Sequence, residues 1–159
     1  MHVTPVVAAV LGSLFFSPAI GAGLGDVAAP TDACALITQA EVSAELGVTV
    51  GPGAHIVDTD PQQCKWIEPG KDETTAKFVM LAMETTMRFK FETSPMPGRI
   101  TEPLAGVGDA AVYVGTAGYS PALSVKKGTS AFQIRVLGFP DAEVKAREKA
   151  LALKAVGRL

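Results

Sequence analysis

The alternation of apolar and polar residues predicts a series of strands enclosed between two helices. The clearest apolar run is Phe78-Val-Met-Leu-Ala-Met83, which is long enough for a strand buried on both faces. Residues 88–92 alternate in the manner of a strand, although five residues also fit a helical turn. Strands are predicted over 48–57, 64–67, 76–85, 111–115, 122–126 and 130–137. A polar turn is predicted over 58–62, a loop over 93–98, and a tight hairpin turn at Lys127-Gly128.

Helix signals lie at the two ends of this region. Thr38 and Glu41 have the spacing of a capping box, and Gly47 is a typical C-terminal stop, so a short helix is predicted over 39–46. Asp141 is predicted to cap a second helix that continues to about Gly157. Strands with short connections between two helices indicate an α+β fold. We expect an antiparallel sheet of about five to six strands, with the N-terminal short helix and the C-terminal helix packed on one side.

The first 22 residues contain no Asp, Glu, Lys or Arg, and an apolar run from Val6 to Phe16 is followed by Ser17-Pro18 and small residues. This layout is typical of a secretory signal peptide, with cleavage predicted near Gly21 to Gly23. An uncleaved anchor or a misassigned start codon is the alternative. We therefore expect a signal peptide over 1–22, a linker over 23–31 and one globular domain over 32–159. The mature chain, without a transmembrane segment, is expected in the periplasm or secreted.

The chain has two cysteines, Cys34 and Cys64. In an oxidising compartment two cysteines in a small domain are expected to form one disulfide. A bridge closing a loop of about 30 residues stabilises a fold by roughly 3.5 kcal/mol in the chain-entropy model. The bridge would attach the entry of the short helix to the sheet, beside a core position for Trp66. The alternative is a metal site formed by both cysteines and His55, which lacks the close Cys-x-x-Cys pairing common in zinc sites.

Three motifs occur in a familiar order: Cys34-Ala-Leu-Ile-Thr-x-x-Glu-Val42, Cys64-x-Trp66, and Gly106-Val-Gly-Asp-Ala-Ala111 before an Ala- and Lys-rich C-terminal helix. Over residues 32–159 the chain resembles a family of small exported proteins of unknown function, many of them actinobacterial lipoproteins. The chain differs in that Asp32 interrupts the apolar box that lipid attachment requires before Cys34. The resemblance implies no catalytic residues.

Searches for recognisable chemistry find no motif with its required context. His55 and Asp58 lack a nucleophile elbow. Asp58-x-Asp60 lacks the remainder of a calcium loop, and Gly106-Val-Gly leads into a predicted strand where a dinucleotide motif requires a helix. The glycines indicate a tight turn in which Asp109 accepts backbone hydrogen bonds. We expect no catalytic residues, metal or cofactor. The net charge of −2 and the absence of a basic stripe argue against nucleic acid.

These observations predict a non-enzymatic exported module that binds a protein, an envelope component or a small molecule. The alternative is a small extracytoplasmic enzyme whose site is assembled from residues distant in sequence. Two unusual loops, 93–100 and 115–121, suggest Met96, Arg99 and Tyr119 as a binding surface, because proline-stiffened loops and exposed tyrosines suit recognition. Alternatively, Met96 and Tyr119 only cover the edge of the sheet.

Overall fold

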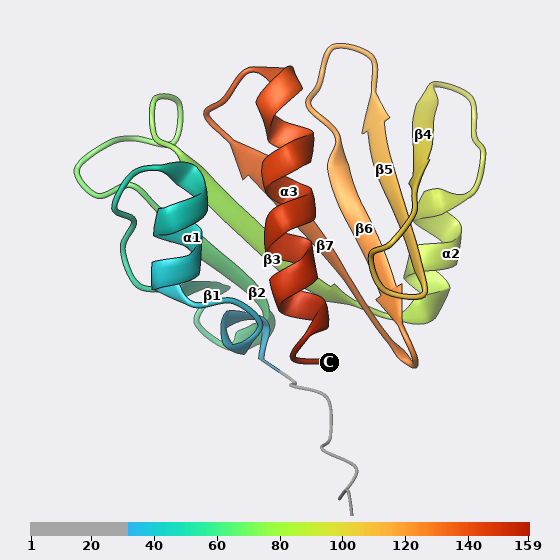
Figure 1. The fold of residues 1–159 in the computed structure, drawn as a ribbon, viewed down its shortest axis with the longest axis horizontal. Coiled ribbons are helices and arrows are strands. Elements are labelled where there is room, and N and C mark those ends of the chain that lie inside the picture. Colours follow the sequence, from blue (N-terminus) through green and yellow to red (C-terminus); the bar gives the residue numbers. More distant parts are fainter. Residues whose placement is uncertain (1–31) are drawn as a thin grey trace, which may run out of the picture.

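The protein is described from a computed structural model that places residues 32–159. The predicted signal peptide and linker lie outside these described residues. The described chain forms one antiparallel sheet of seven strands with three α-helices and a short 3-10 helix (Figure 1). In chain order the elements are η1 (Ala33–Ala35), α1 (Gln39–Leu46), β1 (Ala54–Val57), β2 (Asp60–Ile67), β3 (Phe78–Glu84), α2 (Thr86–Thr93), β4 (Arg99–Leu104), β5 (Ala110–Thr116), β6 (Ala122–Lys127), β7 (Ser130–Leu137) and α3 (Asp141–Val156).

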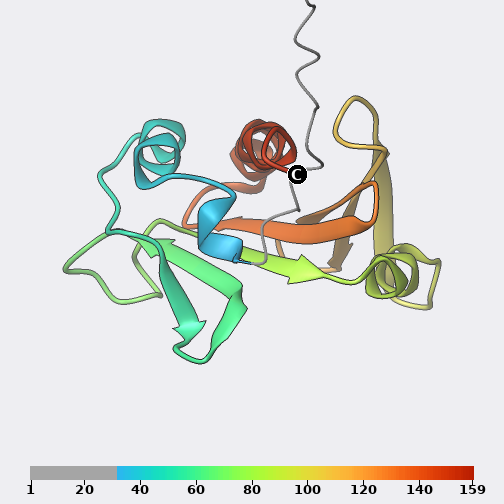
Figure 2. The ribbon, with the colours of Figure 1, turned by 90° about the horizontal axis from the view of Figure 1, so that it is seen from below.

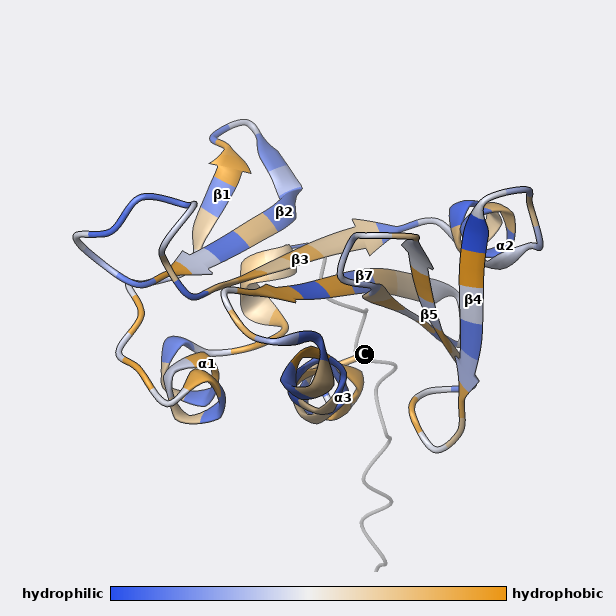
Figure 3. Ribbon diagram, turned by 90° about the horizontal axis from the view of Figure 1, so that it is seen from above, coloured by the Kyte–Doolittle hydropathy of each residue, from blue (hydrophilic) through white to orange (hydrophobic). Residues whose placement is uncertain are grey.

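The strands lie in the order β1-β2-β3-β7-β6-β5-β4, and every neighbouring pair is antiparallel. The central pair joins β3 to β7, which pairs Phe78 with Leu137 and brings the two halves of the chain together. Helices α1 and α3 lie on one face of the sheet, and α2 lies on the other side near β4 (Figures 2 and 3). The predicted α+β class and the helix placement are confirmed, with seven strands where five to six were predicted.

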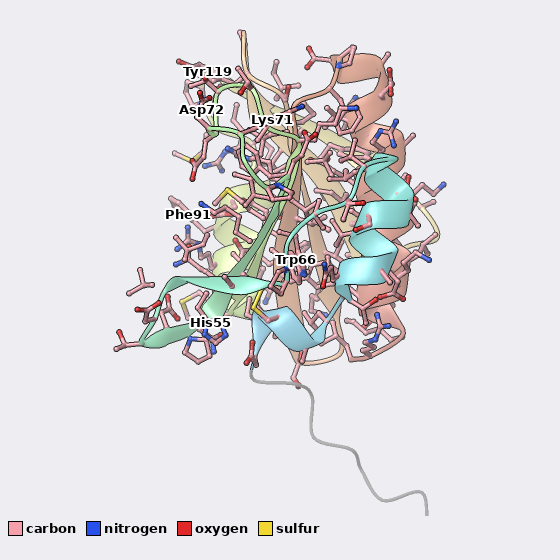
Figure 4. All side chains as sticks on the ribbon, turned by 90° about the vertical axis from the view of Figure 1, so that its left-hand side faces the viewer. His55, Trp66, Lys71, Asp72, Phe91 and Tyr119 are labelled. Atoms are coloured by element: carbon pink, nitrogen blue, oxygen red, sulfur yellow. A yellow bond between two sulfur atoms is a disulfide. The ribbon has the colours of Figure 1, made fainter. Side chains whose placement is uncertain are left out.

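The core lies between the sheet and the layer formed by α1 and α3. On β7 the buried residues Phe132, Ile134 and Val136 alternate with more exposed ones, as expected for a strand with one covered face. Trp66 is 1% exposed and lies between the sheet and α1, which confirms its predicted core position (Figure 4). A Cβ on Gly53 would lie only 2.7 Å from the Trp66 indole nitrogen. Glycine is therefore required where the chain entering β1 crosses this ring.

The predicted start and stop of α1 are both confirmed. Thr38 accepts from the Glu41 backbone N–H at 3.2 Å, and the Glu41 carboxylate accepts from the Thr38 N–H at 2.8 Å, completing the capping box. Gly47 ends the helix at φ +66°, a left-handed conformation that costs glycine little. The helix has only eight residues, so its stability depends on the contacts it makes with its neighbours.

A disulfide and a residue beyond the end of α3 contribute two of these contacts. Cys34 in η1 and Cys64 on β2 form the predicted disulfide, with 5.1 Å between their Cα atoms, and thereby fix the chain entering α1 to the sheet. Arg158, beyond the end of α3, donates to the Glu41 carboxylate at 2.9 Å and to the Leu36 carbonyl at 2.8 Å. Hydrogen bonding to Arg158 holds the pKa of Glu41 well below its usual range, at about 2.

Residues 88–92 are part of helix α2. Their alternation had suggested a strand, with a helical turn as the alternative. Thr85 caps this helix, since its hydroxyl accepts from the Arg88 N–H at 3.1 Å. The Arg88 guanidinium also lies 2.7 Å from the Glu92 carboxylate one turn later. The cap and this i,i+4 pair favour the helix over a five-residue alternation.

Four further boundaries differ from prediction. The strand predicted over 48–57 begins only at Ala54, after Gly51-Pro52-Gly53 has interrupted the extended chain. The turn assigned to residues 58–62 is shorter, because β2 already begins at Asp60. Strand β4 was missed, since its Pro103 argues against a strand; β4 lies at the edge of the sheet, where proline is tolerated. Asp141 is the first residue of α3 and not its cap, which is Pro140, and its carboxylate instead accepts from the Ser120 hydroxyl at 2.6 Å.

Candidate functional site

The face of the sheet opposite α1 and α3 is only partly covered. Helix α2 lies over the strands at one end of this open face, and the β1–β2 hairpin bends toward the same side at the other end (Figure 3). Because side chains alternate along a strand, Met80 and Ala82 of β3 and Gln133 and Arg135 of β7 share this face. The register pairs Met80 with Arg135 and Ala82 with Gln133, so these four side chains form a compact group at the centre of the sheet.

A hollow of about 400 Å³ lies over this group. Its walls come from β2, β3, α2 and β7, which are far apart in sequence. The lining residues are Gln62, Gln63, Met80, Ala82, Met83, Glu84, Arg88, Gln133 and Arg135. Polar amides, charged groups and the flexible Met80 side chain therefore face one small space, a combination typical of ligand pockets. Met83 borders this space from β3, but its side chain packs against the core on the other face of the sheet.

Glu84, at the end of β3, supplies a buried acid to this hollow. Its side chain is only 4% exposed, and its Oε2 atom has no hydrogen-bond partner among residues 32–159. Burial raises the pKa of Glu84 to about 7, and the negative charge of nearby Glu92 acts in the same direction, while Arg88 opposes both. Two ionised carboxylates cannot hydrogen-bond to each other, but a protonated Glu84 can donate to Glu92. Burial and the neighbouring carboxylate therefore both favour the protonated form of Glu84.

Glu92 and Arg88 of α2 connect this acid to the sheet. Glu92 accepts from the Gln133 side-chain amide at 3.1 Å, and the same amide nitrogen donates to Ser124 at 3.2 Å. Arg88 lies 2.7 Å from Glu92 and 3.6 Å from Glu84. These contacts fix the carboxyl groups of Glu84 and Glu92 beside the hollow. Both carboxyl groups contact the Arg88 guanidinium.

Arg135 differs from the other four arginines of the chain, whose side chains all have hydrogen-bond or ion-pair partners. Arg88 and Arg158 form ion pairs, Arg147 contacts Glu143 and the Glu45 carbonyl, and Arg99 donates to two carbonyls. The Arg135 side chain has no hydrogen bond or ion pair within the part of the chain that the structure describes, and it is exposed on a central strand. It is thus a fixed cation with unused donors at the centre of the open face.

A second hollow of about 460 Å³ continues from Gln133 and Arg135 toward the edge of the sheet. Its remaining lining residues are Phe91, Glu92, Arg99, Val114, Gly115, Thr116, Tyr119 and Ser120. We call the two hollows together the sheet groove. Phe91 lies on the side of the sheet away from α1 (Figure 4) and is 61% exposed, and Tyr119 is 78% exposed.

The three residues predicted as a binding surface have different places in this arrangement. Tyr119 and Arg99 both line the second hollow, whereas Met96, 44% exposed, lies outside its lining. Arg99 donates to the carbonyls of Phe91 at 2.7 Å and Ser94 at 3.0 Å, close to the end of α2. Its guanidinium therefore stabilises a helix terminus, and only part of it remains available for a ligand.

The alternative metal site is not formed. The sulfur atoms of Cys34 and Cys64 are joined to each other, so neither offers a thiolate. Asp32, Cys34 and His55 lie close together, but the contact is an Asp32–His55 pair at 3.0 Å, with His55 on β1. Hydrogen bonding to His55 and to the Cys34 N–H lowers the pKa of Asp32. Asp109 accepts from the Gly128 N–H at 2.7 Å, which confirms its predicted role in a turn.

A third hollow, of about 230 Å³, lies on the opposite side of β5, between the sheet and the start of α3, where Tyr113 and Lys145 contribute to its lining. The Tyr113 hydroxyl donates to the Lys145 carbonyl at 2.6 Å, which ties β5 to α3. This hollow is smaller than the other two and its tyrosine is already engaged. The sheet groove is therefore the stronger candidate for binding.

Sequence reasoning missed the residues at the centre of the groove. Glu84 was inside a predicted buried strand and Arg135 inside another, and neither belongs to a motif. For Arg135 the available signal was a single charged residue between the apolar Ile134 and Val136 of a predicted strand; Glu84, followed by Thr85, had no such signal. Comparisons with protein-family models, with curated proteins and with solved structures find no match for this chain.

Proposed function

We propose that this protein is an exported, non-enzymatic module that binds a small molecule outside the cytoplasm, in the sheet groove. The observation that carries the proposal is Arg135, a cation without a hydrogen-bonded or ion-paired partner in residues 32–159, placed where the two hollows meet. The hollows measure about 400 and 460 Å³. These volumes match small-ligand pockets, which span about 300–1,000 Å³. Among the partner classes that the sequence left open, a small molecule therefore fits better than a protein.

Export is the second part of the proposal. A disulfide between Cys34 and Cys64 is expected to persist in oxidising compartments. No helix within residues 32–159 is long and apolar enough to cross a membrane. Together with the predicted signal peptide and the resemblance to exported proteins, these features support a periplasmic or secreted location.

Intact-mass measurement on protein recovered from its native host tests this location. We expect the mature chain to lack about 21 to 23 residues from its start and to be two mass units lighter than the reduced form. A full-length chain with free thiols in the cytoplasmic fraction would contradict it.

An enzyme is the second candidate, and Glu84 is the observation that favours it. A buried carboxyl group with a pKa of about 7, beside the second carboxyl of Glu92 and facing a hollow, resembles the arrangement used in general acid–base catalysis. The two candidates differ in what happens to the ligand. A binding module releases it unchanged, whereas an enzyme releases a product whose formation a Glu84→Gln variant would stop.

Ligand retention tests the proposed site. The exported protein is incubated with a small-molecule extract of its own extracytoplasmic fraction and examined by native mass spectrometry. Ala82→Trp would fill the first hollow, because Ala82 is part of its floor. Leu153→Trp is the matched control, since Leu153 is 47% exposed on α3, on the other side of the sheet.

We expect a retained compound with the native chain and with Leu153→Trp. Ala82→Trp should retain at least about tenfold less, the effect of losing about 1.4 kcal/mol of binding free energy. Equal retention by all three proteins would show that the sheet groove is not the site.

A further inference from the structure

We infer that the ligand of the sheet groove is a small organic acid whose carboxylate binds Arg135. This inference rests on the proposed function and adds the chemical class of the ligand.

The groove has a positive balance of charge in a chain whose net charge is −2. Three guanidinium groups line it, those of Arg88, Arg99 and Arg135, against the two carboxyl groups of Glu84 and Glu92. Both carboxyl groups lie next to Arg88, and Glu84 retains its proton for part of the time near neutral pH. Arg99 and Arg135 are therefore the two cations without a carboxylate beside them. Arg99 already donates to the Phe91 and Ser94 carbonyls, so Arg135 is the one whose donors are open to an anion.

Arg135 has the geometry to bind a carboxylate. Its cross-strand neighbour on β3 is Met80, where an acidic residue would have formed an ion pair. A guanidinium presents paired N–H donors that match the two oxygens of a carboxylate, and such bidentate contacts are stronger than neutral hydrogen bonds. Because Arg135 is on the central part of the sheet, the strands on both sides restrict the position of its backbone.

The rest of the first hollow favours an acid with an apolar body and one polar substituent. Met80 offers soft apolar surface beside Arg135. The Glu84 side chain is only 4% exposed, and its Oε2 atom has no hydrogen-bond partner in residues 32–159. A buried carboxyl oxygen without a partner is costly, so a ligand hydroxyl or amide that reaches it would add affinity.

Three probes of the same shape and different charge test the inference: benzoate, benzamide and benzamidine. The folded protein is titrated with each, and the chemical shifts of its backbone amides are followed by NMR. We expect benzoate to shift the signals of Met80, Gln133 and Arg135, with a dissociation constant of about 1 mM for so small a ligand. Benzamide and benzamidine should bind at least about tenfold more weakly.

Variants identify the group responsible. Arg135→Ala should weaken benzoate binding at least about tenfold, and Arg135→Lys should recover only part of it, because lysine keeps the charge without the paired donors. Lys149→Ala removes the same charge from an exposed site on α3 and should bind benzoate within about twofold of the native chain.

The outcomes separate this inference from the proposed function. Equal or tighter binding of benzamide or benzamidine in the groove would overturn the organic-acid inference and leave the binding site in place. The inference would also be overturned if benzoate bound equally well to Arg135→Ala. The same holds if the shifts were confined to the α1–α3 side of the sheet, or if no probe caused any shift. The retention assay with Ala82→Trp then decides whether the groove binds another class of ligand.

Discussion

Replacing Cys34 and Cys64 together with alanine should lower the free energy of unfolding by about 2–5 kcal/mol. The disulfide joins residues 30 positions apart, and breaking it frees the corresponding loop in the unfolded chain. In the folded protein it holds η1 against β2, immediately before the eight-residue helix α1. A helix this short is marginal in water, so loosening its entry should affect the whole α1 region.

Urea denaturation, with the midpoint and slope fitted together, measures this effect. The native chain under reducing conditions is the control, because it breaks the same bond without changing a side chain. Both should lose a similar amount of stability, and amide hydrogen exchange should rise first in residues 33–46. A loss below about 1 kcal/mol would show that the disulfide is not what secures α1.

The second large effect concerns Glu148, whose carboxyl group is completely buried between α3 and the sheet. Its Oε1 accepts from the Val136 N–H at 3.0 Å. The β6–β7 pairing ends at Leu123 and Ile134, so Val136 extends beyond β6 and the carboxyl group takes the place of a strand partner. Its Oε2 has no hydrogen-bond partner among the described residues. Burial raises the pKa of Glu148 to about 8, and Arg135 and Lys145 only partly oppose this.

The raised pKa predicts that stability falls as pH rises. The folded state binds a proton on Glu148 that the unfolded state releases above its ordinary pKa of 4.5. The stability linked to this proton is fully present below pH 4.5 and is lost as the pH rises toward 8. Between pH 5 and pH 8 the native chain should lose about 3 kcal/mol more than a Glu148→Gln variant, in which this position does not titrate.

Denaturation at a series of pH values measures the difference between the two chains. Comparison with the variant is essential because Glu84, with a raised pKa of about 7, adds a slope of the same sign to both proteins. Glutamine keeps an oxygen that can accept from Val136, so the variant should fold and be the more stable protein at pH 8. Parallel stability curves would contradict the assignment of this slope to Glu148.

Local signals were sufficient to predict much of the fold. The capping box at Thr38 and Glu41 and the stop at Gly47 defined α1, because these effects act within one helical turn. Strand β7 was predicted with its observed ends, 130–137, since the hairpin turn and the apolar alternation agree there. The errors occurred where tertiary context decides the outcome. Pro103 is acceptable only because β4 is an edge strand, a position that no local pattern reveals.

The candidate site was harder to predict for the same reason. Arg135 and Met80 are 55 positions apart in the numbering and become neighbours only through the β3–β7 pairing. Glu84 and Glu92 come together because residues 86–93 form a helix and not the strand that their alternation suggested. Tyr119 and Arg99, which line the second hollow, were suggested by the sequence because they lie in or beside segments with turn-forming residues, although Arg99 is the half-buried first residue of β4. A groove assembled from five different strands and a helix leaves no comparable local signal.

The most direct measurement is the position of the bound ligand. A crystal structure of the exported protein with the compound that it retains would locate that compound relative to the sheet. We predict that it occupies the first hollow, within hydrogen-bonding distance of the Arg135 guanidinium and in contact with Met80 and Gln133. A compound found on the α1–α3 side of the sheet, or in the hollow beside Tyr113 and Lys145, would contradict the account.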